Sequence, residues 1–304
     1  MVGCAPRRAE ALGAAATPDG TARVLLLSSS TLEGVGAAQG ASLRDGMVYV
    51  FGDADTGVIR ELRAVPAMRA GDPPALEPTG RDVRLTRGGV DLVPHPTGLA
   101  FPPASEPGLG VFLSDTVKRK GTIFRIDWER ALADGTLDNA VLATINDDAA
   151  VNGSRPVYAR WREPGTARDR WVIATSDYGP AGNEVRLYDP ERLATAARTG
   201  EPGVLLARIP CGPWVQALHW IDERRTLVLV QNQIEGLGWR LAFARLDGAR
   251  EVVSAPLLDF ARPADELEGM CQLTPLRDCK ALAVMVTSSG TGNVWVAEIE
   301  APAR

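Results

Sequence analysis

The stretch QGASLRDGMVYVFGDADTGVIRELR, residues 39–63, decides the fold of this chain. It contains an inner segment, an apolar strand that ends in a polar residue, a short loop with glycine, and an amphipathic strand. Four further segments repeat this plan: residues 95–128, 154–188, 213–246 and 268–299. Self-similarity at such a period is typical of repeat architectures, in which each repeat is one supersecondary unit.

The spacing of the repeats predicts four-stranded blades. The inner strands are expected to start at Gln39, Thr97, Arg155, Gln216 and Glu268, which lie 58, 58, 61 and 52 residues apart. This spacing suits the four-stranded sheets of a β-propeller with insertions. Four outer strands are expected between the units, over Asp82–Leu85, Ala140–Ile145, Val204–Ile209 and Val252–Leu258.

One outer strand is missing from this count, and the N-terminal region supplies a candidate. Arg23–Ser28 is the only strand-like run before the first repeat. We expect it to pair with the last blade, because this would cover an otherwise exposed sheet edge and close the ring. The chain is therefore predicted to form an all-β, five-bladed propeller over residues 22–304, with six blades as the alternative.

The N-terminus predicts export. Met1-Val2-Gly3-Cys4 resembles the end of a bacterial lipoprotein signal, in which the cysteine carries lipid. Residues 5–21 are small, charged or proline and fit a flexible tether. The expected location is periplasmic or on the cell surface, with a lipid anchor at Cys4 or secreted; an ordinary N-terminus is the alternative.

Charge argues against nucleic acid as a partner. The net charge is −5, and the arginines are scattered among acids rather than clustered. Phosphate binding requires a concentrated positive surface. No run approaches the length of a membrane span, and we expect a monomer.

The remaining cysteines leave two interpretations open. Cys211 and Cys271 precede or lie on neighbouring inner strands and are the plausible disulfide pair, with Cys279 left over. Buried free thiols are the equally open alternative. No spacing of cysteine and histidine indicates zinc.

Two stretches interrupt the β pattern. Glu129–Leu132 and Pro190–Thr199 are predicted to be helical, and Asp189 before Pro190 fits an N-cap. Both lie between third and fourth strands, on the face opposite the one discussed next, and are expected to be decoration.

Propeller topology predicts a functional funnel. The starts of the inner strands and the loops between second and third strands meet at one face of the ring. The residues expected there are Glu33, Gln39, Asp53, Asp55, Asp91, His95, Thr97, Asp115, Asp147, Asp148, Asn152, Arg155, Asp177, Tyr178, Trp214, Gln216, Gln231, Asn232, Asp265, Glu266, Glu268 and Ser288. Buried polar groups are costly unless they are paired, so this set suggests a hydrated pocket, a bound ion or a ligand.

Three aspartates fall at the same place in successive blades. Asp53, Asp115 and Asp177 are each 62 residues apart. A structural role, in which the carboxylate accepts backbone hydrogen bonds in the following turn, is favoured for at least two of them. Asp115 and Asp177 remain candidate catalytic acids, and Asp53 a candidate ligand contact.

The other candidates have two interpretations each. His95 is a candidate catalytic residue or a structural hydrogen-bonding group. Arg155 is expected either to pair with Glu268 or to hold a substrate carboxylate. Tyr178 and Trp214 fit stacking of sugars or simple packing. Gln39 and Gln216 complete the expected ligand contacts, and Glu268 is the candidate general base.

HPTGLAF (residues 95–101), the Asn146–Gly153 stretch and LEGM (267–270) resemble pieces of the gluconolactonase/regucalcin family. The resemblance implies a six-bladed hydrolase with a divalent cation in its channel, and Glu33, Asn152 and Glu268 match the ligand positions best. Calcium or magnesium suits such oxygen ligands. The chain departs from the family in having five blades and in offering Gln216 where Asn-Gly is expected.

A weaker resemblance is to the five-bladed glycosidases of the arabinanase and levansucrase type. These enzymes use two aspartates and a glutamic acid, because glycoside cleavage needs differently poised carboxyl groups. Gln39 stands where the first aspartate is expected. Asp53, Asp115, Asp177 or Glu268 would have to replace the missing triad.

The sequence thus predicts an exported propeller that binds a small polar or carbohydrate-like ligand in an acidic funnel, with hydrolysis of a lactone or glycoside as the candidate reaction. The alternative is a non-catalytic lipoprotein that serves as a protein-binding scaffold. Fold alone cannot distinguish them.

Overall fold

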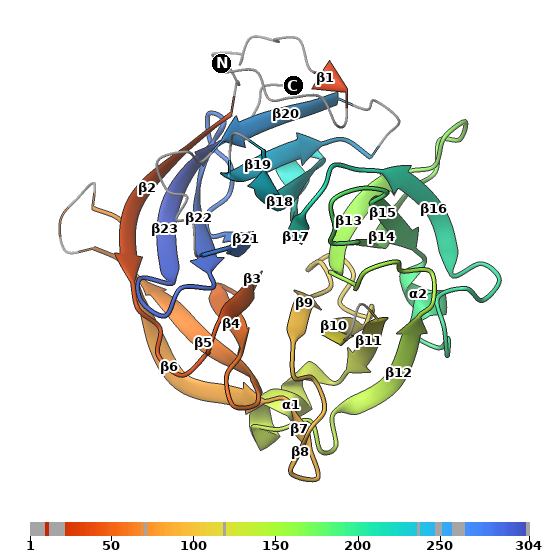
Figure 1. The fold of residues 1–304 in the computed structure, drawn as a ribbon, viewed down its shortest axis with the longest axis horizontal. Coiled ribbons are helices and arrows are strands. Elements are labelled where there is room, and N and C mark those ends of the chain that lie inside the picture. Colours follow the sequence, from red (N-terminus) through yellow and green to blue (C-terminus); the bar gives the residue numbers. More distant parts are fainter. Residues whose placement is uncertain are drawn as a thin grey trace.

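The computed structural model describes residues 10–11, 22–67, 69, 72–117, 120–235, 238–246, 251–256 and 265–301. Five sheets surround a central channel and form a five-bladed β-propeller (Figure 1). The prediction of five blades is confirmed, and the six-bladed alternative is wrong. The lipid anchor predicted at Cys4, and the tether apart from residues 10–11, fall outside the described residues.

Each blade runs from an inner strand beside the channel to an outer strand at the rim. Blades 1 and 2 contain β3 (Ala38–Arg44), β4 (Met47–Asp53), β5 (Gly57–Val65) and β6 (Ala75–Arg84), then β9 (Pro96–Ala100), β10 (Val111–Val117), β11 (Lys120–Ile126) and β12 (Val141–Asp147). The hairpin β7 (Thr86–Arg87) and β8 (Val90–Asp91) lies between them. Blade 3 contains β13 (Val157–Arg162), β14 (Asp169–Ser176), β15 (Glu184–Tyr188) and β16 (Leu205–Pro210).

Blade 4 contains β17 (Val215–Ile221), β18 (Thr226–Ile234), β19 (Gly238–Ala244) and β20 (Glu251–Pro256), and β1 (Glu10–Ala11) pairs with β20 as a fifth strand. A short 3-10 turn, η1 (Asp222–Arg224), joins β17 to β18. In blade 5, β21 (Leu267–Gln272), β22 (Lys280–Thr287) and β23 (Val294–Glu300) come from the end of the chain. Its outer strand is β2 (Arg23–Ser30), from the beginning, and it pairs antiparallel with β23 (Figure 1). The predicted closure of the ring is confirmed.

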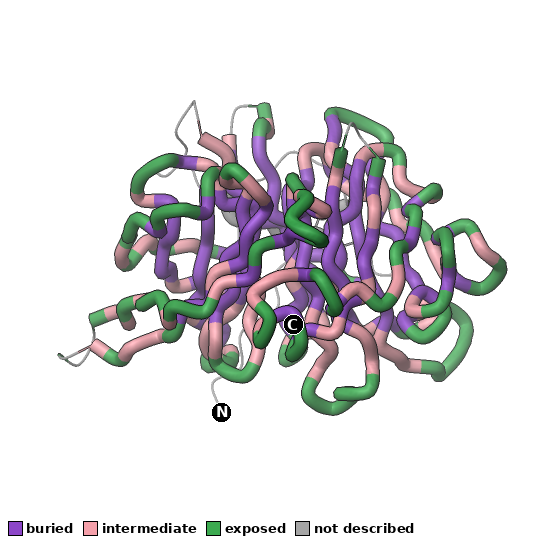
Figure 2. Tube along the Cα trace, turned by 90° about the horizontal axis from the view of Figure 1, so that it is seen from below, coloured by how far each residue is buried: buried purple, intermediate pink, exposed green. Residues whose placement is uncertain are grey.

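Five apolar clusters, one between each pair of neighbouring blades, hold the ring together. Consecutive residues of one strand pack in different clusters: Phe112 packs toward blade 3, whereas Leu113 packs toward blade 1. Because successive side chains of a strand point to opposite faces, a blade buried on both faces needs apolar residues at consecutive positions. This requirement explains runs such as Val48–Phe51, and the buried strands fill the middle of Figure 2.

The two insertions form short helices that also pack. The helices are α1 (Trp128–Asp134) and α2 (Pro190–Leu193), capped by Asp127 and Asp189, so the second is shorter than predicted. Leu193 and Ala196 are buried in the cluster between blades 2 and 3. The view of this insertion as decoration is therefore wrong, because blades diverge toward the rim and the insertion fills the wedge between them. No helix in the described part of the chain is long and apolar enough to cross a membrane.

The predicted disulfide is not formed. Cys211 and Cys271 are free thiols, and burial raises the pKa of each to about 12. They pack in different clusters, Cys211 between blades 3 and 4 and Cys271 between blades 5 and 1, so their sulfur atoms cannot meet. Cys279, which the prediction left over, is disulfide-bonded.

Candidate functional site

A polar layer crosses the channel where the inner strands begin. One residue from each blade contributes, and each is only 3–8% exposed: Gln39, Thr97, Arg155, Gln216 and Glu268, here called the polar ring. In four blades this residue is the unpaired one of a β-bulge, skipped in the pairing of the inner strand with the second strand. Bulges re-aim a side chain relative to its strand neighbours, which gives this repeated polar position an orientation of its own.

One backbone hydrogen bond recurs in all five blades and shapes the mouth of the channel. An N–H group at the end of the second strand donates to the carbonyl of the segment entering the inner strand: Asp53 to Ala37, Thr116 to His95, Tyr178 to Asn152, Asn232 to Trp214 and Ser288 to Glu266. These bonds hold the second-strand ends beside the entry segments, as the topology predicted.

The three repeated aspartates all stabilise this arrangement. Their Oδ1 atoms accept backbone N–H groups of the entry segments at 2.8–3.0 Å: Asp53 from Ala37, Asp115 from His95, and Asp177 from Val151 and Asn152. In blade 5, Ser288 Oγ accepts from Glu266 N in the same way, at 2.8 Å. The structural interpretation therefore describes all three positions.

Asp53 also has a side-chain contact of a different kind. Its Oδ2 atom lies 3.1 Å from His95 Nδ1 and accepts from Gln39 Nε2 at 3.3 Å. Three residues expected in the funnel are thus brought together from blades 1 and 2. The side chain of His95 is 40% exposed, so the imidazole ring borders solvent.

Glu266 is the centre of a second group of contacts. Its carboxylate accepts from Gln216 Nε2 at 2.7 Å, from Gln233 Nε2 at 2.8 Å and from the Tyr178 hydroxyl at 3.3 Å. Gln233 was missed by the sequence analysis. The polar run from Gln231 to Gln233 at the end of an apolar strand is the signal that could have found it.

Glu268 lies beside Glu266 and is almost fully buried. Burial raises its pKa well above the usual range, and the charge of Glu266 and a hydrogen bond to that carboxylate raise it further, against the opposing effect of Arg155. A neutral carboxyl that donates to a neighbouring carboxylate is the expected state of such a pair. Glu268 can therefore donate a hydrogen bond or a proton.

Arg155 is 5% exposed and has few partners. Its guanidinium lies over the Tyr178 ring at 5.3 Å, and Nη1 donates to the Asn152 carbonyl at a long 3.4 Å. Nε has no partner among the described residues. No ion pair joins the described side chains of Arg155 and Glu268 within 4.0 Å, so the pairing left open by the sequence is not formed.

Tyr178 and Trp214 form an aromatic pair at the mouth, with ring centroids 5.1 Å apart. Trp214 has φ 56°, a conformation that is rare for a bulky side chain and costs about 1–3 kcal/mol. Two backbone hydrogen bonds hold it there: Trp214 N donates to the Gly179 carbonyl, and its own carbonyl accepts from Asn232 N.

The expected cation ligands differ in their surroundings, and the cation itself stays a prediction. Glu33 is exposed on the loop between β2 and β3, while Glu268 is buried, and the Asn152 amide nitrogen donates to the Tyr178 carbonyl. In the described ranges, no three His, Cys, Asp or Glu side chains lie close enough to share a metal ion.

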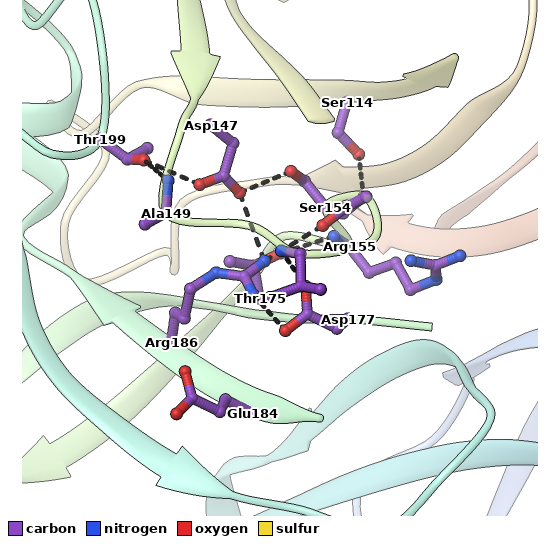
Figure 3. A network of polar contacts seen from close by, with 12 residues as sticks. Ser114, Asp147, Ala149, Ser154, Arg155, Thr175, Asp177, Glu184, Arg186 and Thr199 are labelled. Atoms are coloured by element: carbon purple, nitrogen blue, oxygen red, sulfur yellow. Dashed lines mark hydrogen bonds and ion pairs between the residues drawn. The ribbon is translucent and has the colours of Figure 1, made fainter. Parts of the chain in front are cut away.

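Asp177 belongs to a buried ion-pair network, here called the Arg186 cluster (Figure 3). Arg186 is fully buried and lies 2.6 Å from Asp177 and 3.4 Å from Asp147. Asp147 also accepts from hydroxyl groups of Ser154, Tyr188 and Thr199 at 2.6–2.8 Å. Asp177 thus lies in the protein interior and is occupied by Arg186. Thr199, in the second insertion, bonds to Asp147 and connects the insertion to the cluster.

Asp115, the other candidate acid, is also buried. Burial raises its pKa, and its Oδ1 atom accepts the backbone N–H of His95.

Below the polar ring, a cavity of about 690 Å³ follows the inner strands toward the opposite face. Its lining includes Arg155 and Thr97 as well as Tyr158, Trp171 and Trp220. The sequence analysis did not predict this cavity.

No protein-family model matches the chain, and no curated protein matches it. Solved structures that resemble it include a hydrazine synthase from Kuenenia stuttgartiensis, with 9% identity over 87% of this chain and 66% of that chain, at a TM-score of 0.40. The tail fiber of Staphylococcus aureus phage P68 is 10% identical over 91% of this chain and 52% of that chain, at a TM-score of 0.43. The chain thus spans just under two thirds and about half of these two chains. Neither similarity bears on what the chain binds, and no match supports the resemblances to lactonases and glycosidases.

Proposed function

We propose that the protein binds a small polar, carbohydrate-like ligand at the mouth of the channel, above the polar ring. The observation that carries this proposal is the convergence of Tyr178, Gln216 and Gln233, from two blades, on the Glu266 carboxylate next to buried Glu268. Ligand sites combine a few convergent polar groups with apolar surface. Amides, a carboxylate and a neutral carboxyl together supply donors and acceptors for hydroxyl groups.

The aromatic pair supports a sugar-like ligand. Tyr178 and Trp214 provide apolar ring faces beside these polar groups, as expected for a site that stacks against the CH face of a sugar. Strained backbone persists where the surrounding structure enforces it and clusters at ligand sites. The positive φ angles of Trp214 and Gln233 fit this pattern.

The carboxyl geometry supports binding more than glycoside cleavage. The two carboxyl groups of glycosidases are about 5–9.5 Å apart, so that a sugar carbon, with or without a water, fits between them. The charge of Glu266 and a hydrogen bond to it raise the pKa of Glu268, as expected for two adjacent carboxyl groups and not for the separated pair of a glycosidase. The proposal is therefore a binding function, and turnover of the ligand is a result that the experiment can reveal.

Isothermal titration of the full chain with a panel of neutral and acidic monosaccharides and disaccharides tests the proposal, with product analysis by NMR after long incubation. We expect at least one compound to bind. Trp214→Ala should weaken it about threefold to tenfold, since an aromatic contact contributes about 0.5–1.5 kcal/mol beyond burial, and Glu266→Gln should weaken it further. Arg192→Ala, on an exposed position of α2, is the matched control and should bind normally. If no compound binds, the carbohydrate function fails and the scaffold alternative gains.

A further inference from the structure

Blade 3 buries two arginines that differ in their partners. Every guanidinium nitrogen of Arg186 has one: Nε donates to the Tyr188 hydroxyl, Nη2 to the Gly153 carbonyl and to Asp147, and Nη1 lies 2.6 Å from Asp177. Arg155 has only the long bond from Nη1 to Asn152 and the Tyr178 ring. In Figure 3 its side chain extends away from the network that surrounds Arg186.

An arginine carries five N–H donors, so most of those on Arg155 are unused although the residue is 95% buried. Burying a cation without a partner is costly, and such a group persists only where something else compensates it. Burial lowers the pKa of Arg155 to about 10, which leaves the side chain charged at neutral pH. Arg155 therefore lacks a direct anionic partner among the described residues.

The acids nearby do not supply that anion. Burial and the neighbouring Glu266 raise the pKa of Glu268 well above its usual range, against the opposing effect of Arg155. Glu266 is occupied by Gln216, Gln233 and Tyr178. Asp177 pairs with Arg186. None of these acids forms an ion pair with Arg155 within 4.0 Å, so an entering anion can be the direct partner of its guanidinium.

We propose that Arg155 binds the carboxylate of the ligand, which makes the ligand a sugar acid or a similar polyhydroxy acid. This inference rests on the proposed function, because it concerns the same site. The planar guanidinium matches a carboxylate in a two-pronged geometry. The cavity below the polar ring borders Arg155, so the carboxylate would lie on the cavity side of the ring and the rest of the ligand at the mouth.

The surroundings favour a carboxylate over a phosphate. Glu266 lies in the same layer and repels a doubly charged anion more strongly than a singly charged one.

The test compares D-glucuronate and D-galacturonate with the neutral sugars glucose and galactose, by titration calorimetry on the full chain. Acetate against chloride at equal ionic strength, followed by thermal shift, probes the anion site alone. We expect the acids to bind roughly tenfold to a hundredfold more tightly than the neutral sugars, as hydrogen bonds to a charged group suggest. Acetate should raise the melting temperature. Arg155→Met should remove both effects, and exposed Arg192→Met should keep them.

The outcomes separate the two proposals. If neutral sugars and acids bind equally well to the wild type and to Arg155→Met, the binding function stands and the carboxylate inference is overturned. If acetate protects only chains with Arg155 but no sugar or sugar acid binds, the anion site stands and the carbohydrate function fails. Acids that bind Arg155→Met as tightly as the wild type, or a complete lack of response to every probe, overturn the inference. Circular dichroism of Arg155→Met excludes loss of the fold as the cause.

Discussion

Arg186 in the Arg186 cluster and Arg155 in the polar ring both belong to blade 3. Only Arg186 is surrounded by polar and charged partners (Figure 3). Burial opposes the charge of Arg186, but Asp147, Tyr188 and Asp177 outweigh it and raise its pKa. At Arg155 burial prevails and lowers the pKa to about 10. Both arginines are buried, so their partners, and not the degree of burial, separate a structural arginine from a candidate binding group.

Position in the blade accounts for the difference. Arg186 is on the third strand, where its side chain meets β12 and the entry segment of β13. Arg155 precedes the inner strand and lies at the channel, where no strand follows on the open side. One arginine is surrounded by its own fold, and the other adjoins space that the fold leaves unfilled.

The largest expected effect is that of Arg186→Met. It leaves Asp147 and Asp177 buried without a counter-charge, and breaking a buried pair in this way costs about 3–5 kcal/mol. Urea unfolding at neutral pH should show this loss through a lower transition midpoint. A loss below about 1 kcal/mol would mean that the cluster is hydrated and would weaken the contrast with Arg155.

Asp177→Asn and Asp115→Asn separate the ion pair from the backbone cap. Both side chains accept entry-segment N–H groups through Oδ1, and asparagine preserves that acceptor. Only Asp177 also pairs with Arg186. We expect Asp177→Asn to lose about 1–3 kcal/mol, because a hydrogen-bonded charge is removed from a buried partner, and Asp115→Asn to lose less. Equal losses would show that the cap, and not the ion pair, governs stability here.

Glu268→Gln should change how stability depends on pH. A carboxyl whose folded pKa is raised stabilises the fold fully below its unfolded value near 4.5. That contribution is lost as pH rises toward the folded pKa, by about 1.4 kcal/mol for each pH unit between the two values. Glutamine removes this dependence. Melting curves should therefore show the variant more stable than the wild type at pH 8 and similar to it near pH 4; parallel curves at all pH values would contradict a neutral Glu268.

The smallest effect is expected for Arg155→Met. Since no described carboxylate pairs with Arg155, removing the charge exposes no new unpaired group, and apolar replacement of a buried charge is often neutral or stabilising. Urea unfolding without added carboxylates should place the variant within about 1 kcal/mol of the wild type or above it. A loss as large as that of Arg186→Met would show that Arg155 is a structural residue.

The sequence predicted the funnel better than the roles within it. The inner-strand starts from Gln39 to Glu268 do form one polar layer, because the repeat places them at equivalent points of equivalent blades. The helical insertion after Tyr188 was misjudged, since nothing in its local pattern shows that Leu193 and Ala196 fill a wedge between two blades. The predicted Cys211–Cys271 disulfide is wrong for a similar reason. The repeat places the two cysteines at neighbouring inner strands, but it does not show in which of the clusters between blades each thiol packs.

The sequence by itself determined the number of blades, the strand that closes the ring and the face on which polar residues gather. These features depend on periodicity, and periodicity is a property of the chain that survives without knowledge of any contact. Only the tertiary structure decided which buried charges have partners. Arg155 and Arg186 lie in the same repeat, and Arg186 gains its contact with Asp147 only when blades 2 and 3 pack together. Electrostatic compensation depends on distances across the fold, and no local pattern encodes those distances.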